Sequence, residues 1–184
     1  MKTLRFLLRI VLIIVVAIFC LLAYLGFFSN LKITEKEMGP YTLVYESFTG
    51  PYKDTGAVFT KVYESLKADG IETVNGIGIY YDDPSKVASD KLKSDCGSVI
   101  EEKDLKKLET LKNKYKTKLI KKELSAVAVF PIKNTLSYMI GPMKAYPALA
   151  KYAQEKNYKC TMAYEFYAMK ENKIFFIMPI EVLP

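Results

Sequence analysis

The chain has 184 residues, a formal net charge of +7 and no histidine. The absence of histidine excludes Ser-His-Asp and Cys-His catalysis and any metal site that depends on imidazole ligands. Lys2, Arg5 and Arg9 carry three of the positive charges, and the rest of the chain has 24 lysines, 20 acidic residues and no arginine. Because nucleic-acid interfaces rely on arginine to contact phosphates and base edges, we expect no nucleic-acid partner.

Residues 6–28 form an apolar segment with a single charge, Arg9. The 19 residues from Ile10 to Phe28 carry no charge, and roughly 20 apolar residues suffice to cross a bilayer core. The run is long for a signal peptide and no small-residue cleavage site precedes Ser29, so we expect a retained single-pass helix. Lys2, Arg5 and Arg9 precede the uncharged run and outnumber Lys32 and Lys36, which closely follow it; this favours an N-terminus inside and a domain outside the cytoplasm.

Residues 1–28 are therefore interpreted as a basic segment plus transmembrane helix, residues 29–40 as a linker and residues 41–184 as one domain. Alternation, helical periodicity and turn residues predict the elements of this domain. In chain order they are a strand over 41–48, a helix over 54–67, strands over 77–81 and 93–101, a short charged helix over 102–114, strands over 115–121 and 124–132, a helix over 135–157 interrupted near Gly141-Pro142 and Pro147, and a closing hairpin of 161–169 and 174–180.

The order strand, helix, strands occurs twice, which suggests a duplicated β-α-β-β unit. The predicted class is α+β, with two main helices on one side of an antiparallel sheet. Aligning the two halves places Gly78 opposite Glu165 and Tyr80 opposite Tyr167. Cys96 and Cys160 fall in predicted strands, where we expect buried free thiols rather than a disulfide.

Three stretches resemble a known family: GPYKDTG at residues 50–56, GIYYDDPSKVASDKLKSDCGSVIEE at 78–102, and YPALAKY…YEFYAMKENKIFFIMPI at 146–180. They are similar to GyrI-like small-molecule-binding domains, a group that includes effector-binding halves of AraC-type regulators and SOUL-related proteins. Some members carry an N-terminal membrane helix, among them an autophagy receptor of the endoplasmic reticulum whose domain is cytosolic. The resemblance implies two SHS2-type modules around a pseudo-dyad, a ligand cleft between them, and a glutamate at the cleft floor.

Glu165 matches the position of that glutamate. Along a strand it shares a face with Tyr167, and small Gly78 across from it would leave an open volume walled by Tyr167 and Tyr80. A carboxylate between aromatic rings favours a cation. Phe176 reaches the same region from the partner strand of the hairpin. Further candidate lining residues are Tyr45, Phe130 and Tyr138.

Three functions follow as alternatives. The first is a membrane-anchored module that binds an amphipathic, cationic or hydrophobic small molecule through Glu165. The second is a hydrolase of strained, cyclopropane-type electrophiles, with Glu165 as general base. The third is a membrane-tethered module that recruits a protein partner, which predicts a cleft filled by side chains. No cofactor and no metal are expected, and residues 6–28 provide the contact with the membrane.

Overall fold

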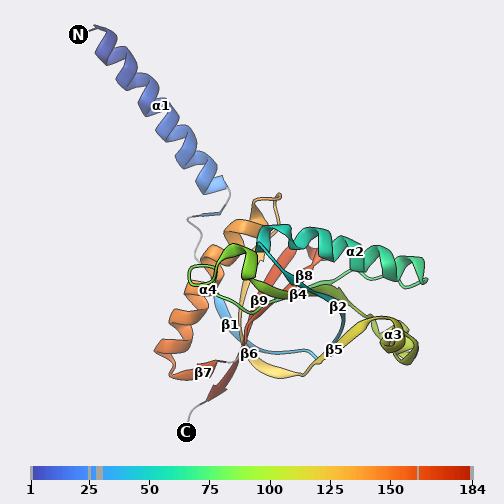
Figure 1. Ribbon diagram of the computed structural model, residues 1–184. Helices are drawn as coiled ribbons and strands as arrows, with labels where there is room; N and C mark the ends of the chain where they lie inside the picture. Colours follow the sequence, from blue (N-terminus) through green and yellow to red (C-terminus); the bar gives the residue numbers. More distant parts are fainter. Residues whose placement is uncertain (1, 25, 28–30, 161, 183–184) are drawn as a thin grey trace.

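The computed structural model describes residues 2–24, 26–27, 31–160 and 162–182. Helix α1 (Lys2–Tyr24) extends away from the rest of the chain (Figure 1). Its segment Leu4–Tyr24 is long and apolar enough to cross a membrane, and none of its most apolar window is buried within the protein. The predicted membrane segment continues to Phe28, but residues 25 and 28 lie outside the described part of the chain.

The remaining elements form a curled antiparallel sheet with helices on its outer side (Figure 1). They are β1 (Ile33–Met38), β2 (Tyr41–Thr49), α2 (Thr55–Ala68), β3 (Gly76–Tyr80), β4 (Lys93–Val99), α3 (Leu108–Lys114), β5 (Lys116–Ile120), β6 (Glu123–Pro131), α4 (Ser137–Glu155), β7 (Tyr158–Cys160), β8 (Tyr164–Ala168) and β9 (Lys173–Val182). Short 3-10 helices occupy Tyr52–Asp54, Ser89–Lys91, Glu102–Lys107 and Met169–Glu171. The strand order is β1-β6-β9-β8-β3-β4-β2-β5, and β7 pairs with β9.

The predicted linker contains an additional strand, β1, which pairs with β6 along its whole length. Three consecutive residues of its sequence ITEKEM, Glu35, Lys36 and Glu37, are charged and exposed, as befits a strand at the edge of the sheet. The β1–β2 connection packs on the β5–β6 connection, and a Cβ atom on Gly39 would lie 2.7 Å from the carbonyl oxygen of Lys121. Gly39 also has a φ of +91°, so both the space and the backbone require glycine there. This contact brings the two ends of the curled sheet together.

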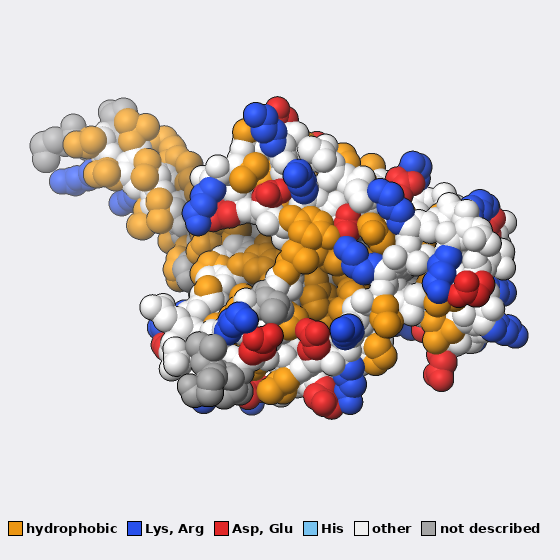
Figure 2. Space-filling model, turned by 60° about the horizontal axis from the view of Figure 1, so that its bottom comes forward, with side chains coloured by type: hydrophobic (Ala, Val, Ile, Leu, Met, Phe, Trp, Pro, Cys, Tyr) orange, Lys and Arg blue, Asp and Glu red, His pale blue; other side chains and the backbone are white. Residues whose placement is uncertain are grey.

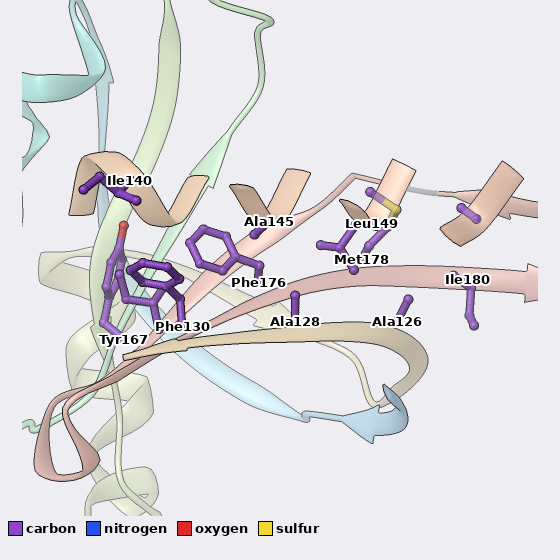
Figure 3. Close-up of a cluster of buried hydrophobic side chains, with 12 residues drawn as sticks. Ala126, Ala128, Phe130, Ile140, Ala145, Leu149, Tyr167, Phe176, Met178 and Ile180 are labelled. Atoms are coloured by element: carbon purple, nitrogen blue, oxygen red, sulfur yellow. The ribbon is translucent and has the colours of Figure 1, made fainter. Parts of the chain in front are cut away.

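Both faces of the sheet are apolar, which explains the continuous hydrophobic runs of the central strands. On the outer face, α4 covers a cluster that includes Ala128, Phe130 and Phe176 (Figure 3), and α2 covers a smaller cluster around Val44 and Leu66. The third cluster consists only of strand residues, with Leu43, Ile77, Val127, Tyr164 and Ile177 among its buried members. Figure 2 shows apolar side chains gathered in a hollow on the underside of the domain.

Helix α4 is continuous from Ser137 to Glu155, so the predicted interruption at its prolines is wrong. Pro142 and Pro147 lack the amide hydrogens that would bond to the carbonyls of Tyr138 and Met143. Packing against the sheet compensates for this loss. Ile140, Ala145 and Leu149 are buried, and a Cβ on Gly141 would lie 2.9 Å from the ring of Phe176. Close contact between helix and sheet therefore maintains a helix that local propensity disfavours.

The expectation of two buried thiols holds for one cysteine only. Cys96 is buried in β4, whereas Cys160 is exposed in β7, and both are free. Residues 102–114 are helical as predicted, although the first six form a 3-10 helix. Leu111 anchors this charged segment because it is buried in the same cluster as Val44 and Leu66.

Candidate functional site

Glu165, the second residue of β8, is 3% exposed. Its two carboxylate oxygens accept hydrogen bonds from two tyrosines: Tyr146 donates to Oε1 at 2.9 Å and Tyr167 donates to Oε2 at 2.7 Å. Among the described residues, no lysine or arginine forms an ion pair with Glu165. A buried carboxyl without a cationic partner is unusual, because isolated charge is costly to bury.

The strand register places small Gly78 directly opposite Glu165, as the sequence predicted. The predicted pairing of Tyr80 with Tyr167 is wrong, since Gly76 lies opposite Tyr167. The two tyrosines nevertheless meet, with 2.9 Å between their hydroxyl oxygens. The ring of Tyr80 folds back over Gly78, where a Cβ would lie 2.8 Å from a ring carbon. Gly78 therefore leaves space, but the Tyr80 ring fills it.

Aromatic rings surround the hydrogen-bonded group formed by the Glu165 carboxylate and the tyrosine hydroxyls. Phe176 lies opposite Glu165 on β9, and its ring centroid is 5.6 Å from that of Tyr146. Other ring pairs in the cluster have centroid separations of 4.8 Å for Tyr52–Tyr80, 5.2 Å for Phe59–Tyr167 and 5.9 Å for Tyr138–Tyr167. Figure 3 shows Tyr167, Phe130 and Phe176 on the side of the sheet that α4 covers.

Burial in these apolar surroundings raises the pKa of Glu165 to about 7, against the lowering effect of the hydrogen bonds from Tyr167 and Tyr146. The carboxyl therefore changes charge near neutral pH. Burial and the neighbouring Glu165 also raise the pKa values of Tyr146 and Tyr167, so both hydroxyls stay protonated and can donate. At neutral pH the ionised carboxylate of Glu165 can therefore bind a cation or act as a base.

The structure brings together most of the residues that the sequence selected. Glu165, Tyr167, Tyr80, Gly78 and Phe176 form the centre of the cluster, with Phe130 and Tyr138 at its edge.

Tyr45 lies on the other face of the sheet, in the strand-only cluster, with the ammonium of Lys118 4.8 Å from its ring centroid. The sequence analysis missed Tyr146, Tyr52 and Phe59. Only the helical spacing of Phe59 from Val62 and Leu66 could have indicated its inward position.

The space beside Glu165 is occupied by its own tyrosines. Two surface hollows lie elsewhere: one is lined by Asp69, Ile71, Lys107, Thr110, Leu111 and Lys114, the other by Pro40, Tyr41, Thr42, Val99, Ile100, Glu102, Leu105 and Leu119. Neither hollow borders Glu165. Within the described part of the chain, no group of three or more acidic or cysteine side chains is placed to hold a metal ion.

Comparisons with known proteins agree with this architecture. No protein-family model matches the sequence. The chain is 29% identical over 171 residues to human testis-expressed protein 264, covering 87% of this chain and 52% of that protein, and 28% identical over 145 residues to its mouse homologue, covering 76% and 45%. The chain thus spans about half the length of these curated relatives.

Solved structures share the fold at low sequence identity. The EcmrR C-terminal domain superposes with a TM-score of 0.61 at 12% identity, covering 83% of this chain and 99% of that domain. SAV2435, solved bound to tetraphenylphosphonium, superposes with a TM-score of 0.50 at 10% identity, covering 82% and 94%. The chain therefore has the mixed α+β fold, with a curled antiparallel sheet, of GyrI-like effector-binding domains, preceded by one apolar helix.

Proposed function

We propose that this chain is a membrane-anchored binding module that takes up a cationic amphipathic small molecule, with Glu165 as the charge partner. The observation that carries the proposal is a carboxyl that is 3% exposed, surrounded by aromatic rings and, among the described residues, bonded only to neutral hydroxyls. An organic cation would supply the missing positive charge, and the rings would add cation–π attraction of roughly 0.5–2 kcal/mol. The fold shared with SAV2435, which binds a lipophilic phosphonium ion, supports the same chemistry.

Binding requires the tyrosine cover to open. Tyr146 lies on α4 between Pro142 and Pro147, in the turn where the helix lacks two backbone hydrogen bonds. The segment that holds this tyrosine over Glu165 is therefore the part of α4 with the weakest internal bonding. We propose that the ligand displaces the Tyr146 ring and hydroxyl, and that Tyr167 and Tyr80 stay bonded to each other beside it.

A thermal-shift assay with two ions of matched shape tests the proposal. The soluble part suffices, because α1 contributes no residue to any of the three core clusters. Tetraphenylphosphonium should raise the melting temperature of residues 29–184 at pH 8 by mass action, whereas tetraphenylborate, of the same shape and opposite charge, should not.

Glu165→Gln should abolish the stabilisation by the phosphonium ion. Equal stabilisation by both ions, or an undiminished effect in Glu165→Gln, would contradict the assignment. No stabilisation by any amphiphile would favour the protein-recruitment alternative, since a site filled by its own side chains is what that alternative predicts.

Hydrolysis of a strained electrophile is a second candidate, favoured by the pKa of about 7 at Glu165. A general base is most effective when its pKa lies near the working pH. Glu165 would take a proton from the attacking water as its oxygen bonds to a ring carbon and a strained ring C–C bond breaks. The proton on Glu165 would then pass to the released carbon, and Tyr146 or Tyr167 would donate a hydrogen bond to the group that carries the developing negative charge. Turnover of a cyclopropane-bearing substrate that disappears in Glu165→Gln, and persists in a variant of an exposed acid such as Glu64→Gln, would establish this activity.

A further inference from the structure

The domain contacts the end of the apolar helix through the segment that precedes α4 and through the first half of α4. The ammonium of Lys133 donates to the carbonyl oxygen of Tyr24 at 2.9 Å, and that of Lys144 donates to the carbonyl oxygen of Gly26 at 2.6 Å. Carbonyls in the last turn of a helix lack intrahelical partners and carry partial negative charge. Lys133 therefore caps the helix at its last residue, and Lys144 binds a carbonyl two residues beyond it. Both contacts hold the start of α4 beside the point where α1 ends (Figure 1).

Exposed apolar side chains are concentrated at this same place. Outside the N-terminal segment, eleven large hydrophobic residues are exposed among those described, and five of them surround the start of α4: Leu136, Tyr138, Met139, Met143 and Met169. Leu136, Met139 and Met143 follow a spacing of three and four residues, so they form one stripe along the outer side of the helix. Met139 is 59% exposed and Met143 is 62% exposed.

The depth of this stripe follows from the anchor. A helix of 23 residues is about 35 Å long, and the hydrocarbon core is about 30 Å thick, so Tyr24 lies near one boundary of the bilayer. The uncharged part of the sequence continues beyond that point to Phe28. Because Lys144 bonds to Gly26, the turn of α4 that carries Met143 lies close to the point where the anchor leaves the bilayer. Lysine at this level is compatible with a lipid surface, since its ammonium reaches polar groups while its methylenes stay in apolar surroundings.

We propose that Leu136, Met139 and Met143 of α4 insert into the interface of the same bilayer that α1 crosses, as a second membrane contact. The inference rests on the proposed membrane anchoring by α1 and is independent of the ligand. It gives the domain a fixed orientation, with the start of α4 against the lipid. Tyr138, at the edge of this contact, has its ring 5.9 Å from that of Tyr167, so the lipid-facing edge adjoins the Glu165 cluster.

Single tryptophans can test this contact, because the chain contains none. The full chain is reconstituted into phosphatidylcholine vesicles in which part of the lipid carries bromine on the upper acyl chain, a short-range quencher of indole fluorescence. Met139→Trp is the test variant and Met143→Trp an independent second one. Leu119→Trp is the matched control, at a position that is 63% exposed on β5, and Leu21→Trp reports insertion of the anchor itself.

The expected result is strong quenching at positions 21, 139 and 143, blue-shifted emission at 139 and 143, and neither effect at position 119. Quenching at position 21 without quenching at 139 and 143 would overturn the second contact and leave the anchor intact. Equal quenching at 139 and 119 would also overturn it, because the domain would then have no preferred face. Absence of quenching at position 21 would overturn the anchoring and the second contact together, without bearing on phosphonium binding by the soluble domain.

Discussion

Replacing Glu165 by glutamine should change how the stability of the domain depends on pH. The pKa of this carboxyl rises from 4.5 to about 7 on folding. Below pH 4.5 the carboxyl is protonated in both states. Between pH 4.5 and 7 the unfolded chain releases its proton while the folded domain keeps it, so the free energy of unfolding falls as the pH rises. Above pH 7 both states are ionised and the fall stops.

The magnitude follows from the size of the shift. Each pKa unit corresponds to 1.36 kcal/mol, so the shift to about 7 costs the wild type about 3 kcal/mol above pH 7, of which about 2.5 kcal/mol is lost between pH 5 and pH 8. Glu165→Gln cannot ionise and should escape this loss. The variant should therefore gain about 2.5 kcal/mol on the wild type between these two pH values.

Guanidinium unfolding of residues 29–184, followed by the near-ultraviolet circular dichroism of the tyrosines, measures this difference. Contributions from other titrating groups cancel when the variant and the wild type are compared at each pH. Glu64→Gln, on the exposed side of α2, is the control and should follow the wild type at both pH values. The reasoning is refuted if Glu165→Gln differs from the wild type by the same amount at pH 5 and pH 8.

Two further predictions concern packing and thiol reactivity. Gly78→Ala should destabilise the domain by about 1–3 kcal/mol, because the new methyl group would displace the Tyr80 ring. The control Gly56→Ala, on the open side of α2, should be neutral or stabilising. Denaturant unfolding of both variants measures the two effects, and equal effects would argue against a filled space over Gly78. Maleimide should modify Cys160 in the native domain but not Cys96, because Cys96 is buried and its burial raises the pKa of the thiol to about 12. Mass spectrometry after a short exposure distinguishes the two cysteines. Labelling of Cys96 in the native domain would contradict its burial.

The sequence predicted correctly those strands whose residues follow a continuous apolar or alternating pattern. Alternation and turn residues identified β2, β3, β6, β8 and β9, and the comparison of the two halves correctly placed Gly78 opposite Glu165. It could not identify β1, because ITEKEM has too few apolar residues to indicate a strand before its partner β6 is known. Tertiary pairing, rather than local preference, makes this segment a strand.

The candidate site was predictable in its centre but not in its cover. The position of Glu165 followed from the family resemblance, and strand alternation added Tyr167. Tyr146 was missed because the two prolines predicted an interrupted helix. Without a continuous helix, the sequence did not indicate on which face of α4 this tyrosine lies. The direction of the Tyr80 ring could not be predicted either, because it depends on the absence of a Cβ at Gly78 and not on strand spacing.

The most direct test of the central claim is a calorimetric titration of the soluble domain with tetraphenylphosphonium at pH 6 and pH 8. A cation that pairs with Glu165 binds the ionised carboxyl, whose population rises about tenfold across this interval when its pKa is about 7. We predict about tenfold tighter binding at pH 8 than at pH 6 for the wild type, and weak, pH-independent binding for Glu165→Gln. Tight binding that is equal at both pH values and unchanged in Glu165→Gln would contradict the account.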